Sequence, residues 1–301
     1  MALVDTQRMI LVTGATGLNG GALVRLLSAR GVEVRALVRS AAKARVLSEL
    51  PNVEIVEGDM AHPETLSAPL RGVERAMLIS SSDPAMLEVQ SNFIDAAKKA
   101  GVKHVVKLSG IMPEVDSPFR FARMHGLIEQ KLERSGMAFT HLRAGEFMHS
   151  YFRQVPAIVA KGALFLPMED ARIASIDIDD IAEVAATTLT AKGHEGKTYP
   201  LTGPDSLSMA EVAEKLSAAT GKTIHYVNIS PEDATKNRLA AGMPAYTAEA
   251  LDELFAERRK GKESQVSPVF EAIVGRRPTS FDEFARRHVA IFRGEEPAPR
   301  V

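Results

Sequence analysis

The chain has 301 residues, enough for one large domain or for a large and a small one, and its 45% hydrophobic and 25% charged residues are typical of a globular protein. Its 37 Lys and Arg balance 38 Asp and Glu, so no overall charge favours nucleic acid or an anionic membrane. The absence of cysteine excludes disulfides and thiolate chemistry, and no apolar run is long enough to span a membrane; we therefore expect a cytoplasmic protein.

The chain begins with a strand, a glycine turn and a helix. Met9 to Thr13 are apolar or β-branched, which predicts a buried strand, and the apolar spacing from Leu18 to Arg30 predicts a helix. The turn between them is GATGLNG. In dinucleotide-binding proteins, glycines at these positions allow a tight turn, the approach of a pyrophosphate and close helix packing. Glycine turns also serve as plain connections. Because the strand and helix are both present, we predict dinucleotide binding, with Gly14, Thr16, Gly17, Leu18, Asn19 and Gly20 among the cofactor-binding residues.

Five more strands alternate with helices up to residue 143. Strands are predicted over 32–38, 53–56, 76–79, 104–108 and 138–143, with helices over 41–50, 65–70, 84–100 and 119–135. This alternation predicts an α/β fold with a doubly wound parallel sheet of the Rossmann type. Ligands bind at the carboxyl ends of the strands in such sheets. We therefore expect the strand ends to line one crevice, with Ser80, Ser81, Ser109 and Gly110 among the cofactor-binding residues.

The alternation loosens beyond about residue 151. We predict a nucleotide-binding Rossmann domain over 1–150 and a smaller α+β substrate-binding domain over 151–301, with 174–192 packing back on the first domain. A short strand is expected over 173–176 and a helix over 177–190. We interpret the acidic residues Asp179, Asp180 and Glu183 as complements to the start of that helix. The basic run 258–262 is interpreted as a solvated helix end.

The residue after the second strand indicates which nicotinamide cofactor binds. An acidic residue there would bind the ribose hydroxyl of NAD, but the chain has Arg39, with Lys43 one turn further on. An arginine offers two parallel hydrogen bonds to a 2′-phosphate, so NADP(H) is favoured over NAD(H). The alternative is that Arg39 is a surface cation. Asp59 is expected to meet the adenine amino group, with Met60 packing on the ring.

Motifs along nearly the whole chain resemble one family. The chain resembles the NmrA-like atypical short-chain dehydrogenase/reductases, in particular the NAD(P)H:quinone reductase and triphenylmethane reductase branch. The resemblance rests on GATGLNG at 14–20, Arg39, GDM at 58–60, KLSG at 107–110, LRAGEFM at 142–148, YPLTGP at 199–204, SMAE at 208–211 and TSFDEF at 279–284. It implies that Gly145 and Phe147 border the nicotinamide, and that Phe147, Met148 and Tyr151 face the substrate.

The chain lacks the Tyr-x-x-x-Lys dyad of extended short-chain enzymes. None of its tyrosines, at positions 151, 199, 226 and 246, is followed by a lysine four residues on. In the quinone reductase branch that the chain resembles, a histidine at the position of the dyad lysine is familiar. The resemblance therefore implies that His125 binds the ribose or supplies a proton. A histidine pKa near 6.5 suits either role. The alternative is a surface histidine paired with Glu129.

Two functions follow from these observations. The first is an NADPH-dependent reductase that transfers hydride directly to a small conjugated acceptor, such as a quinone, azo compound or dye. Such transfer requires orientation more than a strong base, which agrees with the missing dyad. The second is a non-catalytic NADP(H)-binding redox sensor of the NmrA type. The eight histidines show no paired ligand spacing, so no metal is predicted. We expect a monomer or homodimer.

Overall fold

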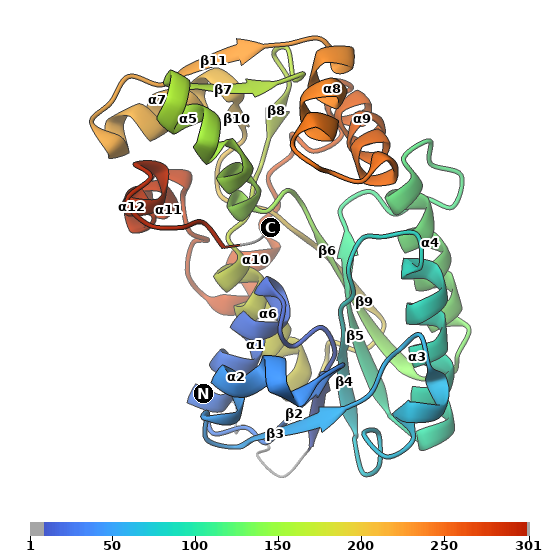
Figure 1. The fold of residues 1–301 in the computed structure, drawn as a ribbon. Coiled ribbons are helices and arrows are strands. Elements are labelled where there is room, and N and C mark those ends of the chain that lie inside the picture. Colours follow the sequence, from blue (N-terminus) through green and yellow to red (C-terminus); the bar gives the residue numbers. More distant parts are fainter. Residues whose placement is uncertain (1–8, 300–301) are drawn as a thin grey trace.

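A parallel sheet of seven strands forms the centre of the larger part of the molecule (Figure 1). It is seen in a computed structural model that describes residues 9–299. Parallel pairing throughout the sheet confirms the predicted doubly wound α/β fold. In sheet order the strands are β3 (Val53–Glu57), β2 (Val34–Val38), β1 (Ile10–Val12), β4 (Arg75–Leu78), β5 (His104–Gly110), β6 (Ala138–Ala144) and β9 (Lys197–Leu201).

Helices cover both faces of this sheet (Figure 1). Ile10 and Val12 of β1 belong to a core shared with one helix layer, whereas Leu11 belongs to the core on the other face. Side chains alternate between the faces of a strand, so a strand buried on both faces is apolar throughout. The first layer contains α1 (Leu18–Ala29), α6 (Ile178–Thr190) and α10 (Val269–Val274), and the second contains α3 (Met86–Ala100) and α4 (Arg120–Glu133).

The smaller part has a hydrophobic core of its own, in which Phe152, Phe284 and Phe292 are buried. It contains two short sheets, β7 with β11 in parallel and β8 with β10 antiparallel. Its elements are η3 (Met148–Gln154), α5 (Val155–Lys161), β7 (Ala163–Leu166), β8 (Arg172–Ile173), β10 (Leu207–Ser208), α7 (Met209–Thr220), β11 (His225–Asn228), α8 (Pro231–Ala240), α9 (Ala245–Arg259), α11 (Phe281–Arg287) and α12 (Val289–Phe292).

The large sheet takes strands from both sides of the predicted boundary at residue 150. Strand β9 lies beyond that boundary and pairs with β6, with Leu142 opposite Tyr199. Ile181 and Val184 of α6 share the core with α1. The division at residue 150 stays a prediction, and the sheet itself continues across it.

Some predicted elements are shorter in the structure. The helix expected over 41–50 is a 3₁₀ turn, η1 (Ala41–Ala44), followed by one turn of helix, α2 (Arg45–Ser48). Only Ala44 and Leu47 of this stretch are buried, which is too little apolar contact to support a longer helix. The helix expected over 65–70 is likewise a 3₁₀ turn, η2 (Pro63–Leu66). Within residues 9–299, no helix combines the length and apolar character that a membrane crossing requires.

The interpretation of the basic run 258–262 as solvated is wrong for Arg258. Its side chain is buried and forms ion pairs with Glu146 and Glu263.

The acidic residues at the start of α6 have more specific partners than a helix dipole. Asp180 is fully buried and accepts hydrogen bonds from Arg276 and from the Thr279 N–H.

Candidate cofactor and active site

The turn between β1 and α1 adopts the tight conformation that its glycines predict. Gly14 has a φ of +60°, a left-handed conformation that favours glycine. Its carbonyl accepts a hydrogen bond from the Gly17 N–H at 2.9 Å. A Cβ atom on Gly20 would lie 2.3 Å from the same carbonyl oxygen, so the first turn of α1 packs directly on the loop. The turn therefore depends on glycine at both positions.

The N-terminus of α1 has room for an anion. Gly17 is the N-cap, and no side chain caps the helix. A Cβ on Gly17 would approach the Gly14 carbonyl oxygen at 3.3 Å, with no other described atom beyond its chain neighbours within 4 Å. The unpaired N–H groups and positive dipole end of a helix bind phosphate. The local geometry therefore fits a phosphate, and the predicted phosphate site stays a prediction.

Polar atoms without partners mark the same edge of the sheet. Asn19 Oδ1 in α1 and Ser109 Oγ at the end of β5 are buried, with no hydrogen-bond partner among the described residues. Buried polar groups are normally paired, so these atoms require a ligand or water. A dinucleotide lying across the ends of β1 and β5 would provide polar groups for both. The residues present fit such a cofactor.

Two cations follow β2 at the position that distinguishes the cofactors. Arg39 and Lys43 are exposed, and within residues 9–299 neither forms an ion pair. The nearby carboxylate of Glu57 accepts a hydrogen bond from the Ala41 N–H at 2.7 Å, at the start of η1. Both cations are therefore available to a phosphate, while this acid has a structural partner.

The remaining predicted binding residues lie at the ends of β3 and β4. Asp59 Oδ1 accepts a hydrogen bond from the Ala61 N–H at 2.9 Å, which leaves its second carboxylate oxygen for an adenine amino group. The neighbouring Met60 is partly buried. Ser80 Oγ accepts a hydrogen bond from Gln90 at 2.8 Å, and Ser81 is exposed.

His125 contacts a lysine in the middle of β5. Lys107 Nζ lies 2.8 Å from His125 Nδ1 and 3.1 Å from the Leu108 carbonyl oxygen. The Lys107 side chain is fully buried. A Cβ on Gly110 would lie 3.3 Å from His125 Cδ2, so the imidazole packs against the last residue of the strand. His125 thus lies at the strand end where the crevice was predicted.

The alternative pairing of His125 with Glu129 is wrong. Glu129 is buried and binds Arg143 of β6 through two hydrogen bonds, of 2.6 and 3.3 Å. No role was predicted for Lys107 or for this ion pair, although Lys107 and Arg143 both lie in motifs that carry the family resemblance. A lysine within the apolar strand HVVKL was the available signal, since a buried lysine requires a partner.

Burial shifts the pKa values of both members of the His125–Lys107 pair. Burial lowers the pKa of Lys107 to about 7, with Glu129 acting in the opposite direction and Arg143 lowering it further. Burial, followed by the adjacent Lys107 charge, lowers the pKa of His125 well below 6.5. The imidazole is therefore neutral near pH 7, and Lys107 is the group of the pair that titrates there.

The loop after β6 connects the sheet to the smaller part. The Gly145 N–H donates to the Leu201 carbonyl at 2.9 Å, and Phe147 forms a bridge with Ile176. Phe147 is partly exposed, whereas Met148 and Tyr151 are buried in the core of the smaller part. Because both side chains are packed in that core, they have little surface left for a substrate. Their contact with the substrate stays a prediction.

Two acids and a histidine of the described residues form a cluster between α4 and β6. The ligand atoms of Glu129, Glu133 and His141 lie within 4.8 Å of one another. Arg143 binds the Glu129 carboxylate, and His141 Nε2 lies 3.2 Å from Glu133. Because these carboxylates already have protein partners, we interpret the cluster as part of an ion-pair network.

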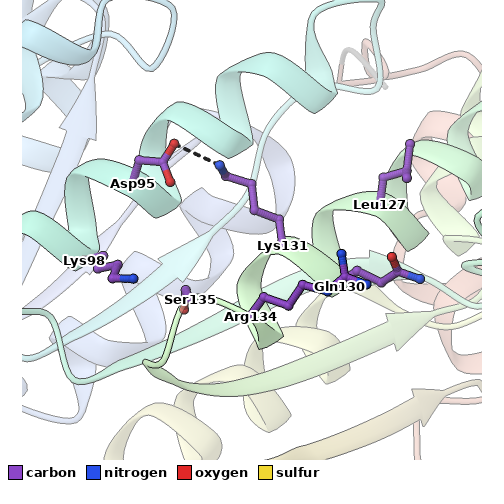
Figure 2. A pocket seen from close by; sticks show the side chains of 7 residues that line it. All are labelled: Asp95, Lys98, Leu127, Gln130, Lys131, Arg134 and Ser135. Atoms are coloured by element: carbon purple, nitrogen blue, oxygen red, sulfur yellow. Dashed lines mark hydrogen bonds and ion pairs between the residues drawn. The ribbon is translucent and has the colours of Figure 1, made fainter.

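A surface pocket of about 360 Å³ lies between α3 and α4 (Figure 2). Asp95 of α3 and Lys131 of α4 form an ion pair across it at 2.9 Å, and both are solvent-accessible. Arg134 and Ser135, at the end of α4, also line it. This end of α4 precedes β6, so the pocket lies toward the amino ends of the strands. None of the predicted site residues lines it.

Comparison with known proteins finds relatives over nearly the full length. The chain is 40% identical to an NAD(P)H azoreductase of Xenophilus azovorans over 284 residues, which cover 94% of this chain and 99% of the relative. It is 32% identical to quinone oxidoreductase 2 of Escherichia coli over 278 residues, with 91% and 96% covered.

Two solved structures have the same fold. The NADPH complex of the Escherichia coli NADPH-dependent quinone oxidoreductase superposes with a TM-score of 0.86 at 31% identity, covering 93% of this chain and 99% of the other. The NADP(H) complex of the Citrobacter sp. triphenylmethane reductase gives a TM-score of 0.84 at 28% identity with the same coverage. The model of the NmrA-like family matches residues 6–285. The chain therefore belongs to the NmrA-like family.

Proposed function

We propose that this protein is an NADPH-dependent reductase that passes hydride directly to a small conjugated acceptor such as a quinone, an azo compound or a dye. The chain is an NAD(P)H-dependent oxidoreductase by its family and by its relatives, an azoreductase and a quinone oxidoreductase. The observation that carries the finer proposal is the 40% identity to the azoreductase over 94% of the chain. The preference for NADPH is supported by the unpaired cations Arg39 and Lys43.

The residues of the crevice suggest how the chain acts. The glycine turn and the N-terminus of α1 would hold the pyrophosphate, and Arg39 with Lys43 the 2′-phosphate. The nicotinamide, when bound, supplies a hydride to the acceptor. His125 Nε2 would then donate a proton to the acceptor after its reduction, as a general acid. Direct hydride transfer does not require the tyrosine–lysine dyad that the chain lacks, because orientation of the reactants provides much of the rate enhancement.

NADPH consumption with a panel of small quinones and azo dyes tests the proposal. We expect multiple turnovers without added metal or flavin, and no oxidation by a Gly17→Val variant that remains folded. A wild-type protein that binds NADPH yet reduces nothing across the panel would exclude the reductase. Such a result, together with a protein partner whose binding follows the redox state of the cofactor, would establish the sensor instead.

A further inference from the structure

Lys107 has no assigned role in binding the cofactor or the acceptor, yet its position is unusual. Its side chain is fully buried, and its ammonium group contacts an imidazole rather than a carboxylate. The nearest acid, Glu129, is bound by Arg143. A buried lysine without a carboxylate partner is unfavourable unless its hydrogen-bond donors have other acceptors. Here the acceptors are the Leu108 carbonyl and His125 Nδ1.

We propose that Lys107 is a positioning residue that keeps the proton of His125 on Nε2 and returns a proton to Nδ1 when Nε2 gives its own to the reduced acceptor. The second half of this proposal rests on the reductase function proposed above. The first half concerns the resting protein and does not depend on catalysis.

The hydrogen bonds determine the tautomer. A charged ammonium group has three N–H donors and no acceptor, so His125 Nδ1 at 2.8 Å must accept. The neutral imidazole then carries its proton on Nε2. This atom has no hydrogen-bond partner within residues 9–299 and is not among the fully buried polar atoms. A Cβ on Gly110 would lie 3.8 Å from it, which locates Nε2 at the end of β5.

The proton step balances within the pair. Hydride transfer to a neutral acceptor, such as a quinone or an azo compound, leaves the acceptor with one negative charge. The Nε2–H bond of His125 breaks as that proton passes to the acceptor anion, and a proton from Lys107 Nζ forms the Nδ1–H bond. The imidazole ends neutral in the other tautomer, Lys107 ends as a neutral amine, and the acceptor leaves protonated. One proton is then taken up from the solvent at Nε2 while Nδ1 returns its own to Lys107, which restores the charged ammonium group.

The surroundings of Lys107 set the pH at which the pair works. His125 and Glu129 face it from α4, and Arg143 and His141 from β6. Burial and Arg143 lower the pKa of Lys107 while Glu129 raises it, for a value of about 7. The charged lysine is therefore abundant below pH 7, and kcat should fall as the pH rises above about 7.

Nitrogen-15 NMR of the His125 imidazole tests the first half directly. In wild-type protein without cofactor at pH 6, where Lys107 is charged, we expect the Nε2–H tautomer. Lys107→Met removes the donor and should produce the Nδ1–H form or a mixture, whereas Lys107→Gln provides an amide donor and should restore Nε2–H. Lys103→Gln removes an exposed lysine from the segment just before β5 and should leave the spectrum unchanged. A wild-type Nδ1–H tautomer would overturn the proposal without any variant.

The pH dependence of kcat tests the second half. We expect Lys107→Met to lower kcat at pH 6 by roughly 10-fold to 100-fold, which is within or below the usual contribution of general acid catalysis. The variant should also lose the decline of kcat above about pH 7. Lys107→Gln should keep the tautomer but also lose that decline, because it has no proton to give. An unchanged profile in Lys107→Met would refute the relay. If wild-type protein has the expected tautomer but reduces no acceptor, the reductase function fails while the positioning role stands.

Discussion

Arg258 of α9 and Glu146 of the loop after β6 form an ion pair inside the protein although 112 residues separate them. Arg258 Nε also donates to Glu263 at 3.0 Å, and 5% of the arginine side chain is exposed. Burial opposes ionisation of Glu146, but Arg258 and the hydrogen bonds from Ser150 and Arg258 hold its pKa below the usual value. One arginine thus fixes the loop that precedes Phe147 to the smaller part of the molecule.

Arg258→Met is expected to destabilise the protein by about 3–5 kcal/mol, because it leaves the buried carboxylate of Glu263 and the partly buried carboxylate of Glu146 without their cation. Urea denaturation measures the change. Arg277→Met is the matched control, since Arg277 is exposed and forms no ion pair with the described residues, and surface changes usually shift stability by less than about 0.5 kcal/mol. Equal unfolding free energies for the two variants would contradict a structural role for Arg258.

Arg39→Ala is expected to weaken NADPH binding by about 1.5–3 kcal/mol, the usual effect of losing a charge-assisted hydrogen bond. NADH binding should change little, because NADH has no 2′-phosphate. Calorimetric titration of both cofactors measures the difference. Arg45→Ala, which removes a cation that is 88% exposed on α2, is the control and should preserve the preference. Equal affinity of the wild-type protein for NADPH and NADH would show that Arg39 does not select the cofactor.

Gly17→Val is expected to abolish cofactor binding while the protein stays folded. Its side chain would fill the space at the N-terminus of α1, where the structure has no close neighbour except the Gly14 carbonyl. Gly20→Ala provides a contrast, because its Cβ would lie 2.3 Å from that carbonyl and should lower the melting temperature. Circular dichroism and NADPH fluorescence measure the two effects. A folded Gly17→Val protein with wild-type affinity would locate the phosphates elsewhere.

His125→Ala distinguishes a proton donor from a ribose ligand. If His125 donates the proton, kcat should fall by roughly 10²–10⁴-fold with little change in NADPH affinity. If it positions the ribose, the loss of kcat should be smaller and the dissociation constant of NADPH should rise. Steady-state kinetics and direct binding measurements separate these outcomes. If His125→Ala has the wild-type kcat and the wild-type dissociation constant for NADPH, both roles are excluded.

Asp177 is expected to make stability depend on pH. It caps α6, its side chain is fully buried, and Arg287 lies 2.9 Å away. Burial raises its pKa to about 6, with the Asp179 charge acting in the same direction and the Asp179 N–H and Arg287 opposing. The folded state then binds this proton more tightly than the unfolded state. Its contribution to stability is therefore complete at low pH and is lost as the pH rises from about 4 through 6.

Asp177→Asn keeps a capping oxygen but does not titrate. Its stability relative to wild type should therefore increase between pH 4 and pH 7, by on the order of 2 kcal/mol. Urea denaturation at several pH values measures this difference. Asp179→Asn, at a side chain that is 67% exposed in the same turn, should lack the effect. Parallel stability curves for wild type and Asp177→Asn would show that the pKa of Asp177 is ordinary.

Local signals in the sequence were sufficient for the nucleotide-binding half of the fold. Apolar periodicity located the strands and main helices of the sheet, and the glycine spacing located the turn at Gly14 because left-handed backbone and close helix packing favour glycine. The position of Arg39 directly after β2 could be predicted because the end of a strand has a known place in a parallel sheet. Each of these features is encoded by residues close together in the chain.

Contacts between distant residues were decided only by the tertiary structure. The pairing of β9 with β6, the burial of Arg258 against Glu146 and the contact of Lys107 with His125 all join separate elements. The residues next to a lysine or arginine in the sequence do not show whether its side chain is exposed to water or buried against a partner. That partner is determined by the order of the strands and the packing of the helices. The sequence by itself determined the cofactor fold, whereas the environment of His125 was set by how β5, α4 and β6 pack together.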